Sequence, residues 1–154
     1  MRASSSPLDD VLPHRPPMVL IDEIVSFDSA AGALTAAVTA KREWCENWVA
    51  IEFMAQTAAA LAGKVDRAEG YAGPARPGFL LGTRRLTLDL DRFNVGERYL
   101  ITAKCAFSDA ETASFECAIR HGDKVVATAA LNAYRPQDIR GFMAEQRREP
   151  CQSS

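Results

Sequence analysis

A single carboxylate within an apolar segment is the clearest chemical feature of the sequence. Glu52 stands in residues 48–63, which are otherwise almost wholly apolar, rich in Ala, and free of Pro and internal Gly. This composition predicts a helix, with Asn47 as its N-cap and Gly63 as its C-terminal stop. Gln56 follows Glu52 by four residues, so both polar groups share one face. An acid and an amide on a helix that is apolar all round, and therefore buried, are typical of an active-site wall.

A base that works near neutral pH would most simply be a histidine, and the sequence has two. His121 precedes Gly122-Asp123 in a predicted hairpin turn, which favours a surface position. His14 has three prolines within three residues, so its backbone is stiff, as a fixed catalytic group requires. Two interpretations of His14 stay open: it is a base that faces Glu52, or it anchors the N-terminal segment.

The composition limits the classes of function. The 154 residues suit one domain, and the net charge of −2 gives no general electrostatic basis for binding nucleic acid. No apolar run approaches the roughly 20 residues that span a bilayer, and the first residues lack the apolar core of a signal peptide. The four cysteines are scattered, without a CxxC pair or a histidine at metal-ligand spacing. We therefore expect reduced thiols, no metal and a cytoplasmic protein.

The order of predicted elements indicates an α+β fold. A loop is expected over residues 66–78 and a short helix over 137–145. We predict one domain over residues 8–135 with tails at 1–7 and 136–154, and an antiparallel sheet wrapped around the apolar helix. The free edges of such a sheet favour pairing of two subunits. The predicted strands cover residues 18–27, 33–40, 79–90, 98–107, 113–121 and 124–134.

Two motifs resemble a known family. Residues 12–22 resemble the Leu-Pro-His-Arg-x-Pro opening of the 3-hydroxyacyl-acyl-carrier-protein dehydratases of fatty-acid synthesis. Residues 52–56 resemble the Glu-x-Met-Ala-Gln motif on the central helix of the same family. The resemblance covers residues 8–135 and implies the hotdog fold, in which a sheet wraps around a helix.

The sequence departs from this family just before the helix. The family's catalytic histidine lies there in a Gly-His-Phe-Pro loop, whereas residues 38–50 contain no His, Gly or Pro. The small dehydratase-like proteins of bacterial aryl polyene gene clusters share this pattern. They also resemble the chain in a Pro-His-Arg-x-Pro-Met opening and in a Trp four residues before the helix Glu, the position of Trp48.

The resemblance implies roles for further residues. Glu52 matches the acid that works on the C3 hydroxyl of the substrate. Gln56 either orients Glu52 or bonds a backbone carbonyl across a dimer, and Glu52 itself could instead be paired at such an interface. The substrate arrives on the phosphopantetheine arm of an acyl carrier protein, and no other cofactor is implied. The residues expected to bind the substrate are Gln56, Val49, Phe79, Leu81 and Gly82.

Several arginines lie close together in the middle of the chain. Arg84, Arg85 and Arg92, together with Arg76, form the densest positive charge of the predicted domain. A basic patch would steer an acidic carrier protein toward the site, and the first three are the expected contacts. The alternative for these arginines is a solvated strand face. For the segment around Gly82, the alternative to a substrate contact is a plain strand bulge.

Three functions remain open from the sequence. The first is dehydration of 3-hydroxyacyl thioesters, with Glu52 as acid and His14 as base. The second is a non-catalytic hotdog subunit that pairs with a complete dehydratase, which the missing loop histidine favours. The third is a thioesterase in which Glu52 activates water, and the Leu-Pro-His-Arg opening speaks against it. A homodimer or a heterodimer with a second hotdog dehydratase is expected.

Overall fold

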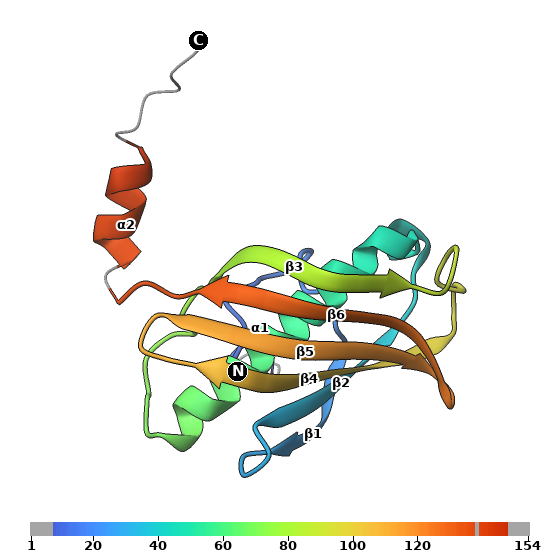
Figure 1. Cartoon of the computed structure of the whole chain (residues 1–154), viewed down its shortest axis with the longest axis horizontal. Helices are drawn as coiled ribbons and strands as arrows, with labels where there is room; N and C mark the ends of the chain where they lie inside the picture. The colour runs from blue at the N-terminus through green and yellow to red at the C-terminus, as the bar shows by residue number, and fades with distance from the viewer. Residues whose placement is uncertain (1–7, 138, 148–154) are drawn as a thin grey trace, which may run out of the picture.

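A curved antiparallel sheet and one long helix form the body of the protein (Figure 1). The computed structural model describes residues 8–137 and 139–147. The helix α1 spans Ala50–Ala68 and follows two short 3-10 turns, η1 (Arg42–Trp44) and η2 (Asn47–Val49). A short helix α2 (Ile139–Gln146) lies apart from the sheet. The strands are β1 (Glu23–Asp28), β2 (Ala33–Thr39), β3 (Phe79–Leu88), β4 (Arg98–Ser108), β5 (Thr112–His121) and β6 (Lys124–Tyr134).

The sheet has the strand order β1-β2-β4-β5-β6-β3, and every neighbouring pair is antiparallel. The chain leaves β2 near one edge, passes through α1 across the concave face, and returns as β3 at the opposite edge (Figure 1). The predicted α+β architecture, a six-stranded antiparallel sheet around a long helix, is therefore confirmed. None of the helices in the described part of the chain is long and apolar enough to cross a membrane.

Aromatic side chains join the start of α1 to the centre of the sheet. The ring of Phe53 meets that of Phe93 edge to face at 5.2 Å, and Phe93 meets Tyr99 at 4.9 Å. All three residues are at most 2% exposed. The buried Tyr99 hydroxyl accepts a hydrogen bond from the backbone N–H of Asn94 at 2.9 Å. Each ring of this size stabilises the fold by about 2 kcal/mol or more through burial alone, so this cluster fixes α1 on β4.

The ends of the predicted helix were wrong at both sides. Asn47 does not cap α1; it begins η2, and its side-chain amide donates to the carbonyl of Leu90 at 3.4 Å. The helix runs on past Gly63 to Ala68, because Gly63 is needed for a close crossing and not for a turn. A Cβ atom at Gly63 would lie 2.4 Å from the carbonyl oxygen of Val11. The predicted loop over residues 66–78 consequently begins three residues later than expected.

The first predicted strand also began too early. Residues 18–22 are extended, yet β1 starts at Glu23. The reason is that the Gln56 side chain takes the backbone groups of Met18, Leu20 and Ile21, which a neighbouring strand would otherwise pair. The remaining strands agree with the predicted ranges to within two residues.

The predicted enclosure of α1 on every side is not found in the single subunit. Phe53, Met54 and Leu61 are buried against the sheet. The face that carries Glu52 and Ala55 is only partly buried, and the Glu52 side chain is 39% exposed. The apolarity of this face therefore has another cause, which is that it lines a cavity.

Candidate active site

The segment that carries His14 is held against α1 by a backbone crossing. Residues 8–12 form a turn in which Leu8, Val11 and Leu12 are buried. The turn crosses α1 at Gly63, where only a glycine leaves room for the Val11 backbone. These contacts fix the residues directly before His14, which lies beside the first turns of α1.

Arginine side chains complete the attachment of this segment. Arg67, near the end of α1, donates to the carbonyl of Asp10 at 2.8 Å. Arg15 donates from one nitrogen to the carbonyls of Leu12 and His14, at 2.8 Å each. The backbone on both sides of the imidazole is thereby held, and the Pro16-Pro17 peptide that follows is cis.

Gln56 fastens the next part of the segment to the same helix. Its side chain is fully buried, and its Oε1 accepts from the N–H of Leu20 at 2.8 Å. Its Nε2 donates to the carbonyl of Met18 at 2.7 Å and to Oε1 of Glu52 at 2.9 Å. One amide therefore anchors the N-terminal segment and holds one oxygen of the Glu52 carboxylate. The backbone carbonyl that it bonds belongs to the same subunit, whereas the sequence had suggested a carbonyl across a dimer.

His14 and Glu52 face each other at the head of a cavity. The imidazole Nε2 lies 3.7 Å from Oε1 of Glu52, too long for a direct hydrogen bond but close enough for an ion pair when the ring is protonated. The Nδ1 atom of His14 is buried and has no hydrogen-bond partner within the described residues. Since buried polar atoms are normally satisfied, Nδ1 is available to a water or a bound group. The two side chains are 30% and 39% exposed, respectively.

The cavity below this pair has a volume of about 410 Å³. One wall is a row of small residues on α1, with Ala55, Ala59 and Ala62 at successive turns. Alanine at these positions leaves the space between helix and sheet unfilled, which explains why the helix is apolar without being packed on this side. The opposite wall comes mainly from the sheet and includes Leu80, Ala113, Phe115, Leu131 and Ala133.

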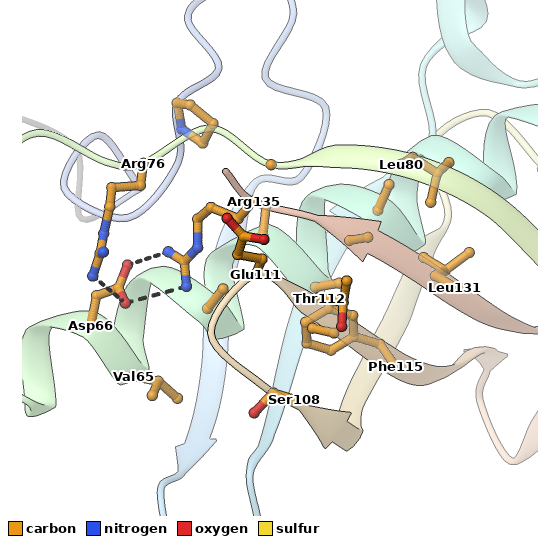
Figure 2. Close-up of a pocket in the computed structure, with 18 of the residues that line it drawn as sticks. Val65, Asp66, Arg76, Leu80, Ser108, Glu111, Thr112, Phe115, Leu131 and Arg135 are labelled. Carbon is orange, nitrogen blue, oxygen red and sulfur yellow. Dashed lines mark hydrogen bonds and ion pairs between the residues drawn. The ribbon is translucent and has the colours of Figure 1, made fainter. Parts of the chain in front are cut away.

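The end of the cavity remote from His14 is charged, which the sequence did not lead us to predict. Asp66 is 5% exposed and binds the guanidinium groups of both Arg76 and Arg135 (Figure 2). The signal was the continued helical spacing of Ala55, Ala59, Ala62 and Asp66, which places all four on one face of α1. It was missed because the helix was expected to stop at Gly63.

A loop between β4 and β5 borders the same end of the cavity. The backbone N–H groups of Glu111 and Thr112 donate to Oδ1 of Asp109 at 2.9 and 2.8 Å. The Thr112 hydroxyl donates to Oδ2 of the same carboxylate. These hydrogen bonds favour the charged carboxylate and hold the pKa of Asp109 below its usual value. The loop therefore has a fixed shape, and it places Glu111 beside Arg135 (Figure 2).

The other residues expected to bind substrate lie away from this cavity in the single subunit. Val49 is buried at the end of η2, directly before α1. Phe79 begins β3, and its neighbour Leu80, rather than Leu81, lines the cavity. Leu81 is 64% exposed and shares with Gly82 a shallow groove on another side of β3. The alternation of side chains along a strand explains this separation of Leu80 and Leu81.

None of the three arginines expected to contact a carrier protein lines the cavity. Arg84 is exposed on β3, and Arg85 lies 3.5 Å from Glu116. Arg92 bonds Glu46 at 2.9 Å and the sulfur of Cys45 at 3.2 Å. The acidic partners of the last two reduce the positive field that the sequence alone indicated. His121 lies at the end of β5, where it pairs with Glu97 at 2.7 Å and stacks on Tyr99.

A wrapped antiparallel sheet, a central helix that carries a carboxylate, and an apolar cavity alongside that helix define a hotdog-fold protein. Comparison with family descriptions matches residues 6–144 to the ApeP-like dehydratases. The chain belongs to this ApeP dehydratase family, and the predicted relation to dehydratase-like proteins is confirmed.

Solved structures share the fold of this chain. A chain of the dehydratase heterocomplex ApeI:P from Xenorhabdus doucetiae is 26% identical, with a TM-score of 0.83, and the match covers 94% of this chain and 99% of that one. An HP0420 homologue from Helicobacter felis matches at 13% identity and a TM-score of 0.64, over 90% and 96% of the two chains.

A putative thioesterase from Ralstonia eutropha, related to phenylacetic acid degradation, also shares the fold. It is 17% identical, with a TM-score of 0.57, over 73% of this chain and 83% of its own. No curated protein matches the chain significantly in sequence.

Proposed function

We propose that this protein removes water from 3-hydroxyacyl thioesters, with Glu52 as the general acid and His14 as the general base. The observation that carries the proposal is the placement of these two side chains 3.7 Å apart at the head of an apolar cavity. A family match to ApeP-like dehydratases supports the type of reaction.

In this reaction the His14 imidazole takes a proton from C2 of the acyl chain. The electron pair of that C–H bond forms the C2–C3 double bond as the C3–O bond breaks. Glu52 gives its proton to the departing hydroxyl, which leaves as water. The Gln56 amide holds one oxygen of Glu52, which leaves the second oxygen free to face the substrate. His14 must be neutral before the step, and it becomes charged beside a newly ionised carboxylate, which stabilises the product pair.

We propose further that the active form includes a second hotdog subunit. The match to a chain of a dehydratase heterocomplex supports this pairing. β3 lies at a free edge of the sheet and exposes Leu80, Leu81 and Leu86, at 45%, 64% and 38%. An edge of this length and apolarity is normally covered by another chain.

The substrate in this proposal is carried by the phosphopantetheine arm of an acyl carrier protein during aryl polyene synthesis. The family match and the heterocomplex support this setting. Arg84, Arg85 and Arg92 remain the proposed contacts for the acidic carrier. Phe79, Leu81 and Gly82 remain proposed substrate contacts that need the assembled dimer, as does Val49. The reaction is proposed to take place in the cytoplasm, in keeping with the scattered free cysteines.

The test is reconstitution. The chain, alone and together with a hotdog protein encoded beside it, is incubated with a 3-hydroxyacyl-carrier protein, and loss of one water is followed by intact mass. We expect Glu52→Gln and His14→Ala each to reduce the rate by roughly 10²-fold or more, the usual contribution of a general acid or base. His121→Ala and Glu23→Gln are the matched controls, because both residues lie outside the cavity and neither contacts a proposed carrier-binding arginine.

The outcome separates the remaining candidates. Full activity of both site variants in the reconstituted pair would show that the partner performs the chemistry and that this chain is a non-catalytic subunit. Release of the free 3-hydroxy acid in place of water loss would indicate a thioesterase, in which Glu52 activates water.

A further inference from the structure

The cavity changes character along its length. Near Glu52 its helix wall consists of Ala55, Ala59 and Ala62, and it becomes charged at Asp66. Glu52 and Asp66 are fourteen positions apart, which corresponds to roughly 21 Å along a helix. Figure 2 shows the two environments together, with Leu80, Leu131 and Phe115 in one part and the charged group in another.

The charged end is a compact cluster built from three parts of the chain. Asp66 belongs to the last turn of α1, Arg76 to the connection before β3, and Arg135 directly follows β6. Arg135 reaches one carboxylate oxygen of Asp66 at 2.5 Å and the other at 3.4 Å. Arg76 donates to Asp66 at 3.0 Å, and its guanidinium lies 4.3 Å from the ring centre of Tyr71. These contacts hold the cluster in place across the end of the cavity.

A hydrocarbon chain gains no binding free energy by extending past such a charged cluster. Asp66 is 5% exposed, so its charge is stabilised by the two guanidinium groups rather than by water. A hydrocarbon chain pushed between them would separate the buried Asp66 carboxylate from its guanidinium partners without replacing the hydrogen bonds. Within the apolar part, by contrast, every added methylene is buried and favours binding.

We propose that the Asp66–Arg76–Arg135 cluster sets the longest acyl chain that the cavity accepts. This inference rests on the proposed function, since it takes the reacting carbons to lie beside Glu52. The distance gives an upper bound of roughly 17 bonds, at ~1.2 Å for each bond of an extended chain. Arg76 is the specificity-determining residue best suited to a test, because Asp66 keeps its two bonds to Arg135 when Arg76 is replaced.

The experiment measures binding of unreactive, saturated acyl-pantetheine amides of increasing length to the protein in complex with its hotdog partner. Affinity should rise about fourfold with each methylene and then stop rising at a fixed length. In Arg76→Met the rise should continue to longer chains, with unchanged affinity for the short ones. Arg135→Met provides a second variant with the same expectation. Arg98→Met is the matched control, because Arg98 forms a 2.8 Å ion pair with Glu23 outside the cavity.

The inference would be overturned by a wild-type affinity that rises through the whole series, or by a limit that stays at the same length in both cluster variants. Dehydration of a short 3-hydroxyacyl-carrier protein, measured on the same samples, tests the proposed function separately. A length limit that shifts in the variants without any dehydration would contradict the catalytic role and leave the inference standing. Failure of every amide to bind would also overturn the inference, while the dehydration assay alone decides the proposed function.

Discussion

Replacement of Gln56 by leucine is the most direct test of how the N-terminal segment is held. The change keeps the approximate volume of the side chain and removes its oxygen and nitrogen. The Leu20 N–H then loses its acceptor in a buried position, and the Met18 carbonyl loses its donor. Glu52 loses the donor that fixes its carboxylate.

The cost follows from the burial of each group. An unsatisfied buried backbone N–H costs about 1–3 kcal/mol, and this applies in full to Leu20. The Met18 carbonyl is only part-buried and can turn to water, so its share is smaller. Together we expect Gln56→Leu to lower the free energy of unfolding by about 2–4 kcal/mol, a large part of the ~5–15 kcal/mol of a typical domain.

The measurement is urea unfolding followed by circular dichroism, with the slope of the transition checked for two-state behaviour. Gln137→Leu is the control, because Gln137 is exposed, and such surface changes usually stay within ~0.5 kcal/mol. If Gln56→Leu matched this control in stability, the hydrogen bonds of Gln56 would not hold the segment, and the argument for a fixed His14 would fail.

Three further predictions follow from other contacts. Gly63→Ala should displace the segment that carries His14, because the new Cβ would meet the Val11 backbone. We expect a strongly reduced dehydration rate and a loss of about 1–3 kcal/mol in the free energy of unfolding. Rates and melting temperatures measured on the same variant test this, and unaltered activity would contradict it. Burial raises the pKa of the Cys117 thiol to about 12, so iodoacetamide at pH 8 should leave Cys117 unmodified in native protein and modify it in urea; native labelling seen by peptide mass would refute the buried position. The lowered pKa of Asp109 stabilises the fold above pH ~4, and this effect is lost as the pH falls through the folded-state pKa. Asp109→Asn should therefore destabilise the fold more at pH 7 than at pH 3, and an equal shift in melting temperature at the two pH values would contradict this.

The sequence sufficed for the parts of the fold that local pattern controls. The apolar run around Glu52 predicted a long helix, and Gly122-Asp123 predicted the hairpin that joins β5 to β6. Both signals are local, since they depend on composition and turn chemistry within a few residues. The pairing of Glu52 with Gln56 was also local, because four residues place two side chains together on any helix.

Long-range contacts account for what the sequence could not predict. In the sequence Gly63 indicates a helix end, whereas in the structure it allows the Val11 backbone to lie against the helix. Met18 was predicted to begin a strand, but its carbonyl accepts a hydrogen bond from the Gln56 side chain. Arg135 lies 69 positions from Asp66, and no local pattern links the two. Which of Leu80 and Leu81 lines the cavity depends on the face of the sheet to which each side chain points. A shift of one residue in strand register would exchange the two.

The proposed acid and base, Glu52 and His14, both come from one chain, and their site is open to solvent on one side. Glu52 keeps 39% of its side chain exposed, and Trp48, one turn earlier, is 59% exposed. The proposed proton transfers, from C2 of the substrate to the imidazole and from the carboxyl group to the leaving hydroxyl, gain from exclusion of water, because the charges formed in the step interact more strongly in a drier site. We therefore expect the partner subunit to act by covering this face. In the proposed mechanism His14 takes the place of the histidine that is missing before α1, since the crossing at Gly63 holds its segment against the helix and its Nε2 lies 3.7 Å from the Glu52 carboxylate.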